Sequence, residues 1–119
     1  MEKKFLPDLH VKGWGSELWI MNSDLYCGKI LLMHSGKKCS WHYHLLKDEV
    51  FYVQSGKVEL LVSEQDEIEK ADLIILNRGD SFHVLPTIRH QMKALEDTEL
   101  FEISTQHFED DTYRVIRGD

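Results

Sequence analysis

From Trp19 onward, apolar residues gather in short runs that are rich in β-branched and aromatic side chains and are separated by polar turn residues. This pattern is typical of an all-β sandwich or barrel. The runs predict seven strands, over residues 29–34, 49–54, 57–63, 73–76, 81–85, 90–95 and 99–105.

The segments between these runs carry residues that tolerate turn dihedrals or hydrogen-bond to their own backbone, namely Ser35-Gly36, Ser55-Gly56, Asn77-Arg78-Gly79 and Glu96-Asp97. A helical turn is expected only within residues 63–71, where an acidic run indicates a solvated loop. No repeat or flexible linker divides the chain. We therefore expect one domain over residues 1–119, with a core at 19–105, an N-terminal arm at 1–18 and an acidic C-terminal tail at 106–119.

The composition narrows the class of protein. A chain of 119 residues with 42% apolar and 29% charged residues is the size and make-up of one ordinary globular domain. The formal net charge of −7 opposes a nucleic-acid partner, because phosphate binding depends on lysine and arginine. No apolar run approaches the roughly 20 residues that cross a bilayer, and Met1–Phe5 are not the start of a secretory signal. We expect a cytoplasmic protein whose Cys27 and Cys39 are buried thiols.

Four residues form a candidate metal site. His42 and His44 are two positions apart, so in an extended segment both imidazoles leave the same face. Glu49 opens the next predicted strand, and His90 opens a later one and supplies a fourth donor. Imidazole and carboxylate together favour one divalent transition metal, such as zinc, manganese, iron or nickel, over calcium or magnesium.

The spacing of this site is more specific than its residue types. Between Gly36 and Gly56 the chain follows the pattern G(x)5HxH(x)4E(x)6G, which resembles the first motif of the cupin superfamily at all five fixed positions. The interval from Gly79 to His90 matches the second cupin motif. That motif is less regular here, since it has Leu85, Thr87 and Ala94 where proline, glycine and asparagine are common. The resemblance implies an all-β cupin barrel, that is, a double-stranded β-helix or jelly roll.

Further segments are similar to the cupin domain of type II mannose-6-phosphate isomerases. Trp14-Gly15-Ser16-Glu17 resembles the WGxE segment of that family, and Glu109-Asp110-Asp111-Thr-Tyr-Arg114 resembles its EDDxxR segment. Two positions depart from the family, because His42 stands in place of a glutamine and Lys47 in place of an arginine. The resemblance implies a metal-dependent sugar or sugar-phosphate isomerase.

An aldose–ketose isomerase polarises a carbonyl group and moves a proton between neighbouring carbons. His83 is a candidate general base, with an outward-facing strand histidine as the alternative. Arg114 is a candidate anchor for a phosphate or sugar. Lys29 is expected to assist from inside the barrel, with a solubilising lysine on an edge strand as the alternative. His10, His34 and His107 are interpreted as surface or satisfied core residues. Glu102 is expected to pair with Lys29 or Arg114, and the run 109–111 alone indicates a solvated acidic turn.

Two other functions fit the same residues. Three histidines and a glutamate are also the ligand set of iron-dependent cupin dioxygenases, and a non-catalytic sugar-binding cupin has the same fold. In each case the expected partner is a small molecule, a carbohydrate for the isomerase. The resemblance also implies a homodimer, whose interface Trp14 and Trp19 could cover.

Overall fold

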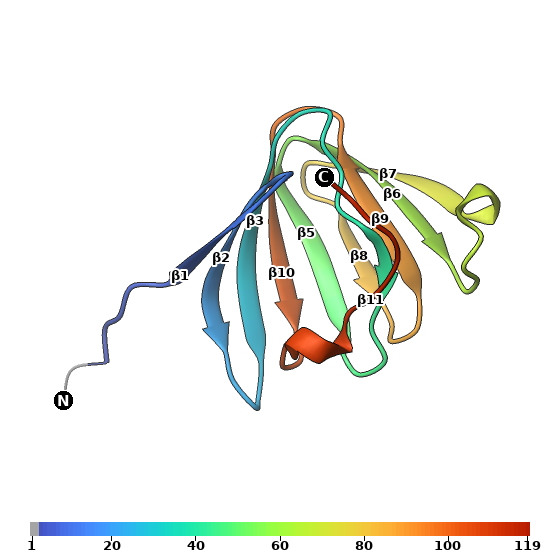
Figure 1. Cartoon of the computed structure of the whole chain (residues 1–119). Coiled ribbons are helices and arrows are strands. Elements are labelled where there is room, and N and C mark those ends of the chain that lie inside the picture. Colours follow the sequence, from blue (N-terminus) through green and yellow to red (C-terminus); the bar gives the residue numbers. More distant parts are fainter. Residues whose placement is uncertain (1–2) are drawn as a thin grey trace.

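A computed structural model describes residues 3–119, and within this range the chain forms two antiparallel β-sheets joined by short turns (Figure 1). The strands are β1 Asp8–Lys12, β2 Gly15–Asn22, β3 Cys27–Met33, β4 Trp41–Tyr43, β5 Glu49–Ser55, β6 Lys57–Ser63, β7 Asp72–Asn77, β8 Ser81–Val84, β9 Arg89–Ala94, β10 Thr98–Ser104 and β11 Tyr113–Ile116. Two 3₁₀ turns, η1 Ile68–Lys70 and η2 Glu109–Asp111, are the other regular elements. In residues 3–119 no helix has the length and hydropathy to cross a membrane.

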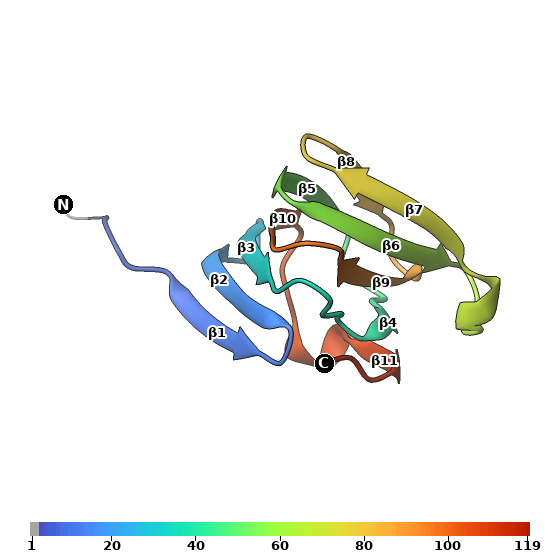
Figure 2. The same ribbon diagram turned by 90° about the horizontal axis from the view of Figure 1, so that it is seen from above.

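The two sheets lie face to face, as the view from above shows (Figure 2). The six-stranded sheet has the order β1-β2-β3-β10-β5-β8, and the five-stranded sheet has the order β11-β4-β9-β6-β7. Neighbours far apart in sequence, such as β3 and β10, pair within each sheet. This is the arrangement of a jelly-roll barrel, so the predicted all-β fold is confirmed.

Alternation along the central strands builds the core. In β3, β5 and β10 every second residue points between the sheets, including Leu31, Val53 and Leu100, which are at most 3% exposed. Burying each such side chain stabilises the fold by about 1.5–3 kcal/mol. The same alternation turns Lys29 and Glu102 inward, so these strands supply both the core and polar groups of the site.

The seven predicted strands are present, with ends that differ by at most two residues. Four further strands were not predicted: β1, β2, β4 and β11. The expected N-terminal arm is corrected here, because β1 and β2 form a hairpin whose second strand pairs with β3. Trp14 at its tip is 8% exposed and belongs to the core, so it is not available to cover a dimer interface.

The C-terminal segment is also part of the sheet structure and not a free tail. β11 pairs with β4, so residues 113–116 lie beside the strand that carries His42. The expected helical turn within 63–71 is η1. The chain thus brings its last strand to the cavity between the sheets.

Two turns explain how the motif spacing is kept. Gly56 has a φ of 93°, and a Cβ at this position would collide with Thr98, so the turn between β5 and β6 requires glycine. Thr87 has a φ of 76° in the turn before β9. Its loop therefore takes the left-handed conformation that glycine adopts readily, even though the residue is β-branched. His90 keeps its expected place as a result.

Candidate metal centre

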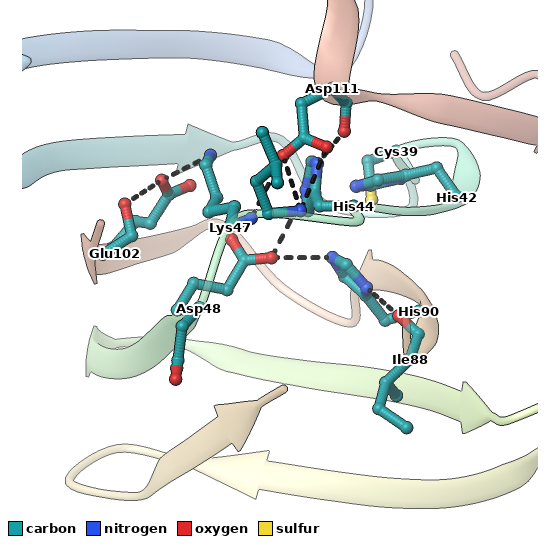
Figure 3. A network of polar contacts seen from close by, with 12 residues as sticks. Cys39, His42, His44, Lys47, Asp48, Ile88, His90, Glu102 and Asp111 are labelled. Carbon is teal, nitrogen blue, oxygen red and sulfur yellow. Dashed lines mark hydrogen bonds and ion pairs between the residues drawn. The ribbon is translucent and has the colours of Figure 1, made fainter. Parts of the chain in front are cut away.

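Three histidines converge between the sheets. His42 lies on β4 and is the register partner of His90 on β9, while His44 follows directly after β4. Their candidate ligand atoms all lie within 4.8 Å of one another, close enough to hold one metal ion. The rings also lie close together, with centroids of His42 and His90 4.4 Å apart. Figure 3 shows the three imidazoles from close by.

Backbone carbonyl groups orient all three rings in the same way. The Nδ1 atom of each ring lies 2.9 Å from a carbonyl oxygen: that of Ser40 for His42, Asp111 for His44 and Ile88 for His90. A carbonyl oxygen only accepts hydrogen bonds, so each Nδ1 carries the hydrogen and donates it. Each Nε2 is left with a free lone pair, which is the form of imidazole that binds a metal.

Glu49 lies beside two of these nitrogens. Its Oε2 is 3.4 Å from His44 Nε2 and 3.3 Å from His90 Nε2, and its side chain is 1% exposed. Among the described residues neither Glu49 Oε2 nor His90 Nε2 has a hydrogen-bond partner. Buried polar atoms without partners are rare because their desolvation is not offset. The orphaned atoms, together with the three free Nε2 lone pairs, fit a divalent transition metal bound by His42, His44, His90 and Glu49.

The protonation of the donors favours metal binding. Burial, then the neighbouring His90 and His44, holds the pKa of His42 well below its usual value, and burial lowers the pKa of His44. Burial opposes ionisation of Glu49, but His90 and Lys47 outweigh it and lower its pKa to about 2. Burial also disfavours the charged form of His90, yet its contact with Glu49 prevails and raises its pKa. At neutral pH most of the donor set is already deprotonated.

The affinity for metal should therefore fall as the pH falls. Metal ligands must be deprotonated, so we expect affinity to fall as pH drops below the ordinary histidine pKa of ~6.5. The lowered pKa values of His42 and His44 move the midpoint of metal loss to lower pH, while the raised pKa of His90 acts in the opposite direction. Metal content after equilibrium dialysis between pH 4 and pH 8 measures the midpoint. Metal retained unchanged at pH 4 would contradict a site built on imidazoles.

Asp111 supports the site from η2 and was missed as a functional residue in the sequence. Its carboxylate accepts hydrogen bonds from the backbone N–H groups of Leu45, Leu46 and Lys47, while its own carbonyl accepts from His44. It is 4% exposed, so the interpretation of residues 109–111 as a solvated turn is wrong for this residue. Asp111 fixes the loop after β4 and the orientation of His44. The resemblance of 109–114 to EDDxxR was the only signal.

The histidines line a cavity of about 530 Å³ that also holds several charged side chains. Lys47 Nζ lies 2.9 Å from Glu102 Oε2, and both side chains are buried. Glu102 thus forms its close ion pair with Lys47, while the expected partner Lys29 is its register neighbour on β3 and attracts it electrostatically. Lys29 points into the barrel as expected, with its Nζ 3.5 Å from Glu17 Oε1. At the exposed rim of the cavity lie Arg114 and Arg117.

His83 is placed away from this cavity, which corrects its assignment as general base. It lies on β8 opposite Val50, on the outer face of the six-stranded sheet, and its side chain is 54% exposed. Its Nε2 is 2.6 Å from Asp48 Oδ1, so it forms a surface pair. His107, which was not predicted as a site residue, lines the cavity, and its side chain is 11% exposed.

Comparison with protein families agrees with this geometry. The family model described as "Cupin domain" matches residues 29–104, which hold all four candidate ligands and most of the strands. The chain belongs to the cupin domain family. No curated protein matches its sequence.

Solved structures of similar fold have low sequence identity to this cupin. Capsular polysaccharide assembling protein CapF from Staphylococcus aureus superposes with a TM-score of 0.80 at 17% identity, over 93% of this chain and 34% of that chain. KdgF from Halomonas sp. has a TM-score of 0.73 at 19% identity, over 87% and 89%. Oxalate decarboxylase from Bacillus subtilis has a TM-score of 0.79 at 15% identity, over 91% and 30%. This cupin spans about a third of the length of CapF, and identities this low show the fold alone.

Proposed function

We propose that this cupin is a metal-dependent aldose–ketose isomerase that acts on a sugar or sugar phosphate, resembling type II mannose-6-phosphate isomerase. One observation carries the proposal: a single cavity holds both the histidine–glutamate cluster and several cationic side chains, namely Lys29, Lys47, Arg114 and Arg117. A bound divalent metal supplies Lewis acidity that polarises a carbonyl group and stabilises negative charge on its oxygen. Fixed cations in the same cavity suit a substrate rich in oxygen atoms.

The cationic residues of the cavity have different proposed roles in binding. Within residues 3–119 the Arg114 side chain has no ion-pair partner, so both arms of its guanidinium are available to an oxyanion. Binding a phosphate group is the role we propose for it. Lys29 and Lys47 lie deeper, each paired with one glutamate, and keep the cavity floor polar. The strand pairing of Arg114 with His42 supports this role, because Arg114 lies beside the strand that carries a candidate metal ligand.

The test is turnover by the reconstituted protein. Protein stripped of metal is loaded separately with Zn²⁺, Mn²⁺, Fe²⁺ or Ni²⁺ and incubated with aldoses and their phosphates, including mannose 6-phosphate. Ketose formation is followed by NMR. We expect conversion of at least one sugar that depends on metal, and absence of conversion under every condition would overturn the proposal.

Arg114 provides a sharper version of this test. Arg114→Ala should raise KM for a phosphorylated sugar by the ~1.5–3 kcal/mol of a charge-assisted hydrogen bond, that is, roughly 10–150-fold, with normal metal content. Arg78→Ala, in the turn between β7 and β8, is the matched control. An unchanged KM in Arg114→Ala would assign this arginine to the surface.

The second candidate function is an iron-dependent dioxygenase. The specific observation that favours it is the donor set itself, since three imidazoles and one carboxylate also suit Fe²⁺. Dioxygen uptake by the Fe²⁺-loaded protein in the presence of small organic acids and sugars separates the two functions. Binding of a sugar without any turnover would support the non-catalytic alternative.

We also propose a homodimer formed through the outer face of the six-stranded sheet. That face is apolar on three adjacent strands, with Leu32 and Ile103 43% and 62% exposed and Tyr52 stacked on Phe101. An exposed apolar sheet face of this kind is typical of an association surface. Sedimentation equilibrium should give twice the chain mass, and Ile103→Lys should give the monomer. A monomeric parent would contradict the dimer.

A further inference from the structure

Glu17 is a carboxylate on the cavity wall that the metal centre does not use. It lies on β2, two residues before Trp19, and lines the same cavity as the three histidines. Its Oε1 accepts a hydrogen bond of 2.9 Å from Trp19 Nε1 and faces Lys29 Nζ at 3.5 Å. Its side chain is 16% exposed, and within residues 3–119 its Oε2 makes no hydrogen bond. One oxygen is thus fixed and the other is free.

The reaction proposed above needs a base in this cavity, and His83 is on the outer face. The three clustered histidines are unsuited, because each donates its Nδ1–H to a carbonyl and directs Nε2 to the metal site. Glu49 lies among the same nitrogens. The base must therefore come from the remaining groups on the cavity wall.

Those remaining groups are already engaged or poorly suited. Glu102 Oε2 accepts hydrogen bonds from both Lys47 and Ser104. His107 packs edge-on against Trp19, and its Nε2 faces Glu109 Oε1 at 3.7 Å. Glu109 is 83% exposed, and Asp119 Oδ2 accepts from the backbone N–H of Lys38. Glu102 and Asp119 each keep a second oxygen as well, but the Glu102 side chain is 6% exposed beside a buried lysine and Asp119 is exposed. Among the described groups, Glu17 is therefore the partly exposed wall carboxylate with one oxygen held and the other free.

We propose that Glu17 is the general base that carries the proton between neighbouring carbons of the substrate. This assignment rests on the isomerase function proposed above. Trp19 and Lys29 act as positioning residues, since both contact Oε1 and leave Oε2 without a partner. Burial opposes ionisation of Glu17, but Lys29 and Trp19 outweigh it and keep its pKa below the usual value, so it is a carboxylate at neutral pH.

The proton balance of the reaction closes with this one residue. Glu17 Oε2 takes the proton from carbon 2 of the aldose. The electron pair of that C–H bond becomes the C1–C2 double bond, and the carbonyl π pair moves to oxygen 1 to give an enediolate. The hydroxyl proton of oxygen 2 then passes to oxygen 1, and the electron pair left on oxygen 2 forms the carbonyl at carbon 2. The C1–C2 π pair takes the proton back from Glu17 as a new C–H bond at carbon 1. The carboxylate is regenerated, and no other reactant is consumed.

The experiment compares metal-loaded parent protein with Glu17→Gln in D₂O, using the aldose or aldose phosphate that the parent converts fastest. Glutamine keeps an acceptor for Trp19 but cannot accept the substrate proton. We expect kcat to fall by about 10²–10⁴-fold, which is the usual contribution of a general base, with deuterium exchange at carbon 2 lost in parallel. Metal content and sugar affinity by calorimetry should stay at the parent level. Glu59→Gln, on the five-stranded sheet, is the matched control.

The outcomes separate this proposal from the proposed function. A parent protein that converts no sugar overturns both. Conversion by Glu17→Gln at the parent rate overturns the role of Glu17 and leaves the isomerase standing. If Glu17→Gln lost metal or sugar binding together with kcat, Glu17 would have a structural role, and its assignment as general base would be overturned. Partial recovery of turnover in Glu17→Ala on addition of formate, a small external carboxylate, would support the base directly.

Discussion

The His44→Ala variant is expected to lose most of its metal affinity, whereas His42→Gln should keep much of it. Alanine at position 44 removes Nε2 and puts no donor in its place. The loss should exceed the roughly 10–100-fold that follows removal of a residue that only supports a ligand. Glutamine at position 42 carries an amide oxygen that can still coordinate a divalent ion. This harder donor should shift preference from copper and nickel towards manganese.

The measurement is metal content and dissociation constants of the two variants beside the parent, with circular dichroism as the check on folding. The same pair of variants distinguishes the two candidate activities. An isomerase should retain turnover with glutamine at position 42, whereas an oxygen-activating iron site should lose it with the imidazole. A His42→Gln protein as free of metal as His44→Ala would show that the two donors are not interchangeable, and would favour the dioxygenase.

Removing either member of the buried Lys47–Glu102 pair should destabilise the fold strongly, and the two single variants should lose different amounts of stability. Both side chains are at most 6% exposed, so removing either leaves a charge with little solvent. The electrostatic part of this cost is limited, because the partner left behind can lose its charge instead. At pH 7 this ceiling is about 3.7 kcal/mol for a glutamate and about 4.6 kcal/mol for a lysine, from their ordinary pKa values. Glu102→Leu should therefore destabilise more than Lys47→Met.

Urea unfolding at pH 7 measures both changes, and the double variant Lys47→Met/Glu102→Leu is the matched control. Because it leaves no buried charge, the double variant should recover most of the loss. Glu102 already has a raised pKa, owing to burial and then to Glu49. In Lys47→Met the protonated form of Glu102 is favoured further. The loss in free energy of unfolding relative to the parent should therefore be smaller at pH 5 than at pH 7. Equal stability of parent and single variants would contradict a tightly buried pair.

The central strands and the four candidate ligands could be predicted because their signals are local. Strands such as β5 and β6 carry apolar side chains at every second position, and Gly56 marks the turn between them. His42 and His44 share a face of an extended segment whatever lies opposite. The motif spacing then related them to Glu49 and His90, and the structure brings all four together.

The edge strands could not be predicted for the same reason. β4 has three residues, too few to show a period, and β11 is exposed at all four positions. β1 is mostly exposed as well, and it is ordered by its pairing with β2. Pairing with another strand, and not burial of an alternating face, holds these segments in place. A pattern of apolar residues therefore contains little information about them.

The sequence by itself determined the β-fold and the candidate donor set, whereas the inward direction of Lys29 was one of two alternatives that the structure resolved. Only the tertiary structure decided which polar groups share the cavity. His83 sits opposite Val50 on the outer face, and a shift of one residue in that register would have turned it inward. Asp111 reaches His44 across more than 60 residues of chain, and Glu17 meets Lys29 through the pairing of β2 with β3. Such contacts follow from the pairing and register of distant strands, which no local pattern encodes.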